Sequence, residues 1–363
     1  MIDILKLARP DILTLQPYQH AAWEPSLERM HANEMPWRAT RDASGAGLNR
    51  YPEPQPAELI DHLARLYGVK SENVLAGRGS DEGIDLLVRA FCRAGQDKVL
   101  ICPPTFGMYK VSAKIQGAGL VEVPLIKERN FALDAPAVIA ACSNDPTIKL
   151  VFLCSPNNPT GNLLDRKDVE SICETLKDRA VVVLDEAYIE FAEAESFVSA
   201  LARFENLVIL RTLSKAYALA GARCGAVLAH ADIVSLLARV ITPYALPTHT
   251  IDAVLEYTDG QHAAEARERI GTILSERKRL AAQLAKLAAI THVWPSDSNF
   301  LLVECSDADQ VLRAAMSAGL IIRDPRSNPA LARCVRISVG TVEQNERLIR
   351  AIAALPGLAG DAA

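Results

Sequence analysis

The chain has 363 residues, of which 50% are hydrophobic and 23% are charged, and its formal net charge is −5. A chain of this length can bury a sizeable core and favours one large domain with a smaller one beside it. The weakly acidic balance excludes a bulk attraction to nucleic acid or to acidic membranes, so we expect small-molecule partners, no nucleic acid and no membrane.

The first residues and the cysteines bear on the compartment. Charges at Asp3, Lys6, Arg9 and Asp11 interrupt the apolar residues there, which argues against a signal peptide. Nowhere does an apolar run reach the roughly 18 residues that a membrane-spanning helix needs. The eight cysteines include no CxxC pair, which favours buried thiols in a reducing compartment. We therefore expect a cytoplasmic protein.

Short apolar runs alternate with helical patterns along the first two thirds of the chain. The runs at 99–102, 150–154, 181–184 and 207–210 predict strands that are buried on both faces of a largely parallel sheet. A helix is predicted over 81–91, with Ser80 and Asp81 as its cap and with Ile84, Leu87, Val88 and Phe91 on its buried face.

After about residue 245 the pattern changes to a long helix near 262–288, a strand-like run at 299–305, a helix, two strand-like runs at 319–324 and 334–339, and a last helix. The fold class that we predict is α/β, with a large domain built on a mostly parallel sheet and a smaller α+β domain. We expect an N-terminal segment at 1–35 that joins the small domain, the large domain at 36–245 and the small domain at 246–363.

Unusual polar residues follow each predicted strand of the large domain. PPTFGMY begins at 103, SPNNPTG at 155, DEAY at 185 and RTLSK at 211. In an open α/β sheet, ligands bind beyond the carboxyl ends of the strands, so these segments should converge on one site.

Lys215 and Asp185 are the informative side chains of these segments. Lys215 is flanked by apolar residues, which suits an amine that attacks a carbonyl to form a Schiff base, although a solvated surface lysine is the ordinary alternative. Asp185 ends an apolar strand, where a carboxylate is often a helix cap or half of an ion pair. If the carbonyl belongs to a pyridine cofactor, however, a buried carboxylate keeps the ring nitrogen protonated.

A second constellation suits a single phosphate. GRGSDEG at 77–83 opens a helix with small residues, so backbone N–H groups can face an anion. Thr212, Ser214 and Arg223 add hydroxyls and a guanidinium. The glycines match neither GxGxxG nor a P-loop. A plain turn and a surface ion pair are the alternatives.

Together, these stretches resemble the fold-type I pyridoxal-phosphate aminotransferases over nearly the whole chain. SPNNPTG, and SxK with the later arginine, carry the resemblance to the superfamily. LNRYPEPQP at 48–56, PPTFGMY and DEAYIEF narrow it to the histidinol-phosphate aminotransferase branch.

The resemblance implies pyridoxal 5′-phosphate as cofactor, bound covalently by Lys215, which then moves a proton on the substrate. It implies that Asp185 pairs with the pyridine nitrogen, that Asn158 and Tyr188 bond the ring O3′, and that Tyr109 stacks on the ring. The implied phosphate ligands are Ser80 and Asp81 through their backbone, Thr212, Ser214, Arg223, and Tyr51 from the second subunit of a homodimer.

On the substrate side, the resemblance implies that Arg323 and Arg336 serve the glutamate carboxylates and the substrate phosphate in turn, with Tyr51, Tyr18 and Asn33 as helpers. An arginine within an apolar strand is costly to bury unless it meets an anion, but an internal salt bridge is the alternative. His31 departs from the family, which usually has a small polar residue there.

The implied reaction interconverts histidinol phosphate plus 2-oxoglutarate and imidazole-acetol phosphate plus glutamate. Two rivals on the same fold stay open: a threonine-phosphate decarboxylase and a broad aromatic amino-acid aminotransferase. A transcriptional regulator with an aminotransferase-like domain is a third, but the sequence offers no DNA-binding module. The seven histidines include no HExxH motif, so no metal site is expected.

Overall fold

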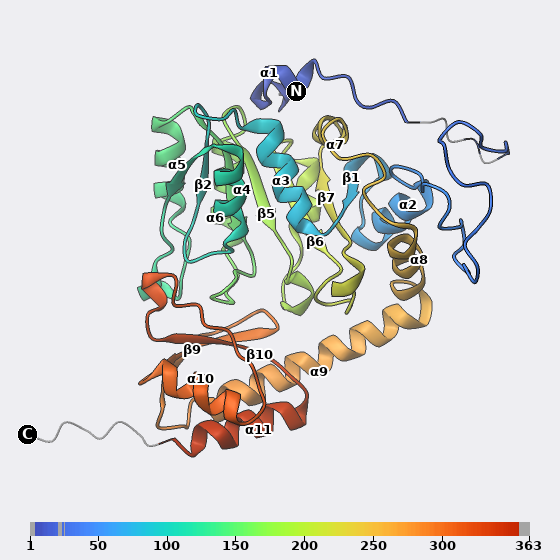
Figure 1. The fold of residues 1–363 in the computed structure, drawn as a ribbon. Coiled ribbons are helices and arrows are strands. Elements are labelled where there is room, and N and C mark those ends of the chain that lie inside the picture. Colours follow the sequence, from blue (N-terminus) through green and yellow to red (C-terminus); the bar gives the residue numbers. More distant parts are fainter. Residues whose placement is uncertain (1–3, 21–23, 25, 356–363) are drawn as a thin grey trace, which may run out of the picture.

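A computed structural model describes residues 4–20, 24 and 26–355, and its core is a seven-stranded sheet in the order β1-β7-β6-β5-β4-β2-β3 (Figure 1). The strands are β1 (Val74–Gly77), β2 (Lys98–Ile101), β3 (Gly119–Glu122), β4 (Ile148–Cys154), β5 (Val181–Asp185), β6 (Leu207–Thr212) and β7 (Gly225–Ala229). The α/β prediction is confirmed, and the four strands predicted from sequence are β2, β4, β5 and β6.

Five neighbouring strands, from β6 to β3, run parallel, whereas β7 pairs antiparallel with both β6 and β1. The sequence analysis did not identify β1, β3 and β7. Each contains a glycine and only two valine or leucine residues, so none gives an apolar run as prominent as those of β2 and β5, which are equally short.

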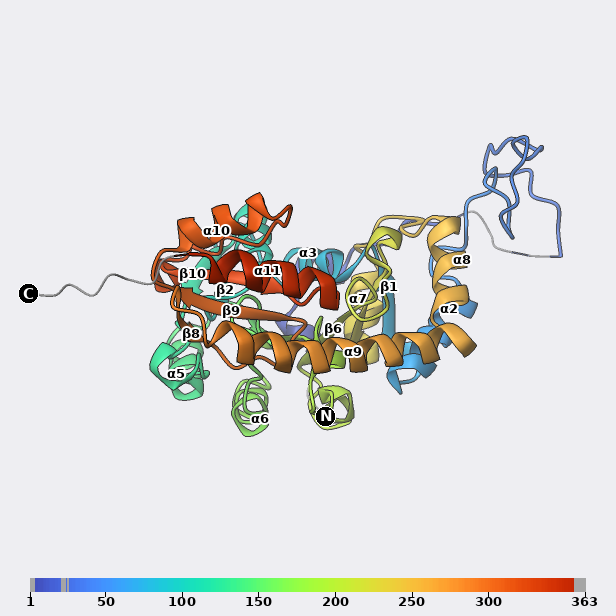
Figure 2. The same cartoon turned by 90° about the horizontal axis from the view of Figure 1, so that it is seen from below.

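Helices cover both faces of this sheet because its strands are apolar on both sides. Val99, Leu150 and Val183 point into a core cluster shared with η1, α3, α4 and α7, and their neighbours Leu100 and Val151 point into a cluster shared with α2, α5 and α6. Figure 2 shows α5 and α6 on one side of the strands and α3 on the other. The helices of this part are η1 (Ile4–Leu7), α1 (Pro10–Leu13), α2 (Ala57–Tyr67), α3 (Ser80–Phe91), α4 (Met108–Gln116), α5 (Ala135–Asn144), α6 (Arg166–Thr175), α7 (Ala231–Ala238) and α8 (Thr248–Tyr257).

The start of α3 differs from the prediction in its cap. The predicted buried face is correct, since Ile84, Leu87 and Val88 are fully buried. The N-cap is however Gly79, with φ at 81° and no side-chain cap, so Ser80 and Asp81 are the first residues of the helix itself. Glycine adopts a positive φ without steric cost. Because Gly79 has no side chain, the first N–H groups of α3 have no side-chain acceptor at the cap position.

The small domain is built on a second sheet. The long helix α9 (Gly260–Leu284) leads to an antiparallel sheet in the order β10-β9-β8, and α9, α10 and α11 pack on it (Figure 1). Its remaining elements are β8 (Ile290–Val293), β9 (Phe300–Cys305), α10 (Ala308–Ser317), β10 (Cys334–Ser338) and α11 (Val342–Ala353). The strand-like run at 319–324 forms only an isolated bridge, between Arg323 and Arg336.

The N-terminal segment packs differently from our expectation. Ile4, Leu7 and Ala8 insert into the core cluster of α3 and α7, so residues 4–13 lie on the large domain and not on the small one. Much of the segment 26–55 projects beyond the rest of the molecule at the right of Figure 2, and its end returns to the large domain, where the Gln55 side chain exchanges hydrogen bonds with the backbone of Ala76 in β1. The three predicted domain boundaries stay a prediction, and residues 1–3 and 356–363 at their outer ends lie outside the described part. In that part, no helix combines the length and apolarity that crossing a membrane requires.

Candidate active site

A cavity of about 620 Å³ lies beyond the carboxyl ends of β4, β5 and β6, with residues of the small domain on its other side. This volume is in the range of small-molecule sites. Most of the predicted site residues line it: Ser80, Asp81, Asn158, Asp185, Tyr188, Thr212, Ser214, Lys215, Arg223, Arg323 and Arg336. The convergence expected from strand order is therefore what the tertiary structure produces.

Lys215 lies in the loop that follows β6. Its side chain is exposed to the open cavity, with Nζ 5.8 Å from the centre of the Tyr188 ring. The apolar residues beside it point elsewhere, since Leu213 is fully buried in the core. The amine is thus on the cavity side of the loop and accessible to a carbonyl compound.

Asp185 is the last residue of β5 and is only 2% exposed. Burial raises the pKa of its carboxyl group to about 6, against the lowering effect of hydrogen bonds from Tyr109 and from the backbone N–H of Ala187. One carboxylate oxygen accepts the Ala187 N–H at 3.1 Å, and the other accepts the Tyr109 hydroxyl at 2.7 Å. These two hydrogen bonds fix the direction of the carboxylate, and Asp185 lines the cavity.

Asn158, Tyr188 and Arg336 form a polar chain across the cavity between the two domains. The Asn158 amide donates to the Tyr188 hydroxyl at 3.3 Å, and the Arg336 guanidinium donates to the Asn158 carbonyl oxygen. Burial raises the pKa of Tyr188 and lowers that of Arg336. Arg336 also lies 5.1 Å from the centre of the Phe300 ring, a cation–π contact that helps to hold it.

The predicted phosphate constellation comes together at the N-terminus of α3. Arg223 donates to the Ser214 hydroxyl at 3.4 Å and to the Asp81 carboxylate at 3.3 Å. Ser214 in turn donates its backbone N–H to the Thr212 hydroxyl at 3.2 Å. A Cβ on Gly225 would lie 2.6 Å from the Ser80 nitrogen, so only glycine lets β7 approach this helix start. Backbone N–H groups, hydroxyls and a guanidinium thus surround one small volume, which fits a phosphate monoester.

Arg323 and Arg336 supply the small-domain wall. Their backbones exchange hydrogen bonds of 3.0 and 2.9 Å, which places the two side chains side by side at the edge of β10. The buried Nε of Arg336 has no hydrogen-bond partner among the described residues. A buried donor without an acceptor is costly, so it favours an anionic guest at this position.

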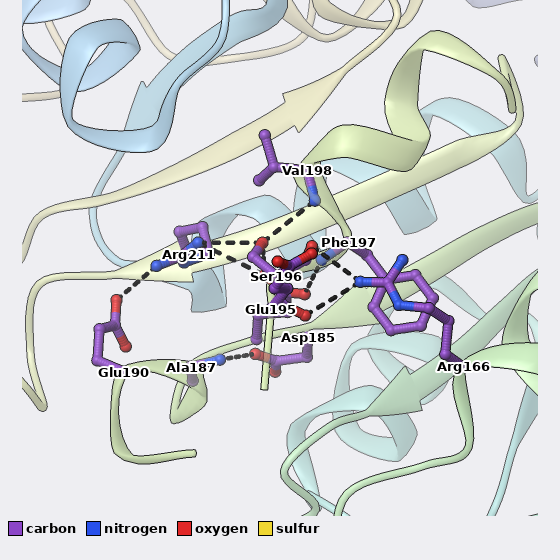
Figure 3. Close-up of polar contacts among 10 residues, drawn as sticks. Arg166, Asp185, Ala187, Glu190, Glu195, Ser196, Phe197, Val198 and Arg211 are labelled. Atoms are coloured by element: carbon purple, nitrogen blue, oxygen red, sulfur yellow. Dashed lines mark hydrogen bonds and ion pairs between the residues drawn. The ribbon is translucent and has the colours of Figure 1, made fainter. Parts of the chain in front are cut away.

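Behind the cavity, a buried ionic cluster joins the ends of β5 and β6 (Figure 3). Asp185 and Ala187 line the cavity, and Glu186 between them points away from it, as the alternation of a strand requires. Arg211 donates to Glu190 at 2.6 Å and to Glu186 at 3.5 Å. Glu186 also accepts the Ser196 hydroxyl at 2.5 Å and the Phe197 N–H at 2.7 Å. The sequence analysis did not identify this cluster, although a charge next to each strand end was a signal for it.

Tyr109 is a correction to the sequence analysis, which expected it to stack on the cofactor ring. It is fully buried, does not line the cavity, and stacks on Phe152 of β4 with ring centres 4.8 Å apart. Its position in the first turn of α4 directs the ring into the core. Phe106, three residues earlier in the loop before α4, lines the cavity instead. The same motif, PPTFGMY, therefore contains the cavity aromatic, but at its other aromatic position.

Three predicted residues of the N-terminal segment do not line the cavity of their own chain. Tyr18 is 66% exposed and contacts His20 edge to face, and Asn33 is also exposed. Tyr51 is 51% exposed and stacks on Tyr244 with ring centres 4.5 Å apart. A lone chain does not test the expected contribution of Tyr51 to a second subunit. Tyr18 and Asn33 are not among the residues that line the cavity of their own chain.

The described residues contain no group of three or more histidine, cysteine, aspartate or glutamate side chains arranged to hold a metal ion. The functional groups that line the cavity include an amine, carboxylates, hydroxyls and guanidinium groups. Residues 27–352 match the family model "Aminotransferase class I and II". The chain belongs to this family.

Curated members of the family are similar to this chain over most of its length. A histidinol-phosphate aminotransferase from Xylella fastidiosa (strain 9a5c) is 47% identical over 331 residues, which cover 90% of each chain. One from Stenotrophomonas maltophilia (strain R551-3) is 42% identical over 97% of each chain.

Solved structures show the same fold. A histidinol-phosphate aminotransferase from Sinorhizobium meliloti, solved in complex with pyridoxal-5′-phosphate, has a TM-score of 0.74 at 27% identity and covers 84% of this chain and 82% of its own. An L-threonine-O-3-phosphate decarboxylase from Porphyromonas gingivalis has a TM-score of 0.68 at 23% identity, covering 84% and 90%. The fold is thus shared by enzymes of different reaction classes, and the fold by itself does not choose among them.

Proposed function

We propose that this chain is a pyridoxal-phosphate-dependent histidinol-phosphate aminotransferase, which transfers the amino group of glutamate to imidazole-acetol phosphate. Relatives that carry this name are 41–47% identical to the chain and cover most of it. The observation that carries the proposal is that one cavity holds an accessible lysine, a buried carboxylate and a pair of arginines, which together match the cofactor and two anionic substrates.

The residues present fit the cofactor. Arg223, Ser214, Thr212 and the first N–H groups of α3 would hold its phosphate, and the Asp185 carboxylate would accept a hydrogen bond from its protonated ring nitrogen. Asn158 and Tyr188, which already bond each other at 3.3 Å, would hold O3′. Phe106, which also lines the cavity, would pack against the ring.

When bound, pyridoxal 5′-phosphate supplies a carbonyl for the amino group and a protonated ring that absorbs the electrons released at the substrate Cα. Lys215 would bind the carbonyl group of the cofactor and would act as the general acid and base that moves the proton of the substrate Cα. Asp185 would keep the ring nitrogen protonated. Arg323 and Arg336 orient the substrate through its anionic groups, so that its Cα faces the Lys215 amine.

We propose further that the active unit is a homodimer and that Tyr51 completes the phosphate site of the partner subunit. Residues 26–55 carry several large apolar side chains that are mostly exposed in the single chain: Leu27, Met30, Met35, Trp37 and Tyr51. Exposed apolar surface of this kind is typical of an interface. The proposed compartment is the cytoplasm, supported by eight cysteines that are all buried as free thiols.

The test is a half-reaction with purified protein loaded with pyridoxal 5′-phosphate, followed by the absorbance of the bound aldehyde form. Histidinol phosphate is expected to lower the absorbance of the aldehyde form rapidly, with appearance of imidazole-acetol phosphate. Phenylalanine is expected to react far more slowly, because it lacks the phosphate that Arg323 and Arg336 would bind. Faster reaction with phenylalanine would favour an aromatic aminotransferase, and release of carbon dioxide from threonine phosphate would favour a decarboxylase.

A further inference from the structure

The phenol of Tyr109 contacts the Asp185 carboxylate on the side that faces away from the cavity. Tyr109 donates its hydroxyl to Oδ2 of Asp185 at 2.7 Å, and both side chains are buried, at 0% and 2% exposure. The backbone N–H of Ala187 donates to the other oxygen at 3.1 Å. These are the two hydrogen bonds that this carboxylate receives within the described part of the chain, and Tyr109 supplies the one from a side chain.

Aromatic contacts hold the ring of Tyr109 in place. Its ring stacks on Phe152 with an interplanar angle of 10° and meets the edge of Phe106 at 5.6 Å, within a core cluster of buried residues. Since Tyr109 does not line the cavity and Asp185 does, the phenol lies behind the carboxylate as seen from the cavity. A ring packed on two sides cannot follow the carboxylate if that group turns, so the hydroxyl fixes its direction.

We propose that Tyr109 is a positioning residue, which stabilises the ionised form of Asp185 and so keeps the pyridine nitrogen of the cofactor protonated. The inference rests on the proposed function, since it concerns the same cofactor. Asp185 and the ring nitrogen share one proton, which makes either a neutral pair or a carboxylate facing a pyridinium. A donor aimed at the carboxylate favours the second arrangement.

The surroundings of Asp185 oppose its ionisation, and the hydrogen bond from Tyr109 acts against them. Burial raises the pKa of the carboxyl group, and the nearby carboxylates of Asp81 and Glu186 act in the same direction. Cys154 and Tyr188 also interact with Asp185, and burial raises the pKa values of both, so they are neutral at pH 7. Without the Tyr109 hydroxyl, the pKa of Asp185 would rise further, and the shared proton would move from the ring nitrogen toward the carboxylate.

The experiment compares Tyr109→Phe with Tyr67→Phe. Tyr67 is also buried, at 7% exposure, but its hydroxyl has no hydrogen-bond partner among the residues that the structure describes. Each variant removes one buried oxygen atom, and only the first removes a donor to Asp185. The probes are pyridoxal 5′-phosphate and its deaza analogue, in which carbon replaces the ring nitrogen, and the dissociation constant of each is measured on the cofactor-free full-length protein.

Tyr109→Phe is expected to weaken binding of pyridoxal 5′-phosphate by roughly tenfold, the effect of one hydrogen bond to a charged group, and to leave binding of the deaza analogue nearly unchanged. Tyr67→Phe is expected to alter neither constant. The ratio of the two constants is taken on one preparation, so an inactive fraction of a less stable variant cancels. Thermal unfolding of the cofactor-free variants checks that both are folded.

Equal weakening of both ligands by Tyr109→Phe would show a merely structural role and overturn the inference, as would no weakening of either. If the wild-type protein itself does not bind pyridoxal 5′-phosphate, the proposed function fails and the inference fails with it. If the wild-type protein binds pyridoxal 5′-phosphate more tightly than the deaza analogue and Tyr109→Phe keeps that preference, only the role of Tyr109 is refuted.

Discussion

The large domain and the small domain each form one wall of the cavity, and their side chains are held by different contacts. On the large-domain wall, Asp185 and Thr212 end paired parallel strands, and the buried Arg211 cluster ties those strand ends together from behind. On the small-domain wall, Arg336 keeps a buried Nε without a partner among the described residues, and Arg323 is exposed.

This difference suits the two roles that we propose, bond chemistry at the large-domain wall and anion recognition at the small-domain wall. Bond chemistry needs a carboxylate at a fixed position, and the two hydrogen bonds that Asp185 receives hold it there. Recognition of an anion needs donors that are still available, and the small-domain wall offers them. Substitutions on the first wall should therefore lower kcat, and substitutions on the second should raise KM.

The largest effect is expected at Lys215. Lys215→Ala removes both the covalent attachment and the proton carrier, so turnover should fall by more than about 10⁴-fold. Steady-state kinetics and the absence of the lysine-linked absorbance band of the cofactor would check this. Ordinary turnover by the variant would remove the basis for assigning the chemistry to this wall.

Asp185→Asn should have the next largest effect. The amide cannot balance the charge of a protonated ring, and loss of one partner of a buried ion pair costs about 3–5 kcal/mol, which corresponds to a fall in kcat of roughly 150- to 5,000-fold. The KM for histidinol phosphate should change little, because Asp185 does not face the substrate anion. An unchanged kcat would contradict the pairing with the ring nitrogen.

Arg336→Gln should change binding more than rate. Loss of a forked, charged donor is expected to raise the KM for histidinol phosphate by roughly 10- to 100-fold, with a smaller change in kcat. The matched control is Arg333→Gln, an exposed arginine three residues earlier that donates to the Cys305 carbonyl and does not line the cavity. A fall in kcat at constant KM would show that the two walls do not divide the work in this way.

Tyr51 tests whether a second subunit completes the large-domain wall, and its effect should be the smallest. Tyr51→Ala is expected to weaken binding of pyridoxal 5′-phosphate by roughly five- to tenfold through loss of one phosphate contact. Hybrid dimers are then made from one Tyr51→Ala chain and one Lys215→Ala chain. If Tyr51 acts across the interface, the site that keeps Lys215 receives an intact tyrosine and binds with wild-type affinity. Weak binding at that site would mean that Tyr51 acts within its own chain.

The sequence predicted the strand ends of the large domain well, and the reason is local. The runs at 99–102, 150–154, 181–184 and 207–210 are apolar on both faces, which only strands of a covered, mostly parallel sheet can use. Because parallel strands end at one edge, the polar segments after them had to meet. That argument placed the segments that contain Asp185, Asn158 and Lys215 at one site without any knowledge of side-chain direction, whereas the role of Asn158 came from the resemblance to the aminotransferases.

Side-chain direction and long-range packing were decided only by the tertiary structure. Both aromatic residues of PPTFGMY were plausible beside the ligand, and the start of α4 at Met108 turns Tyr109 into the core and leaves Phe106 at the cavity. The course of residues 26–55, and the packing of residues 4–13 on the large domain, follow from contacts with distant elements that no local pattern encodes. Hydrophobic periodicity specifies which faces are buried, whereas the identity of the neighbour that buries them is set by the whole chain.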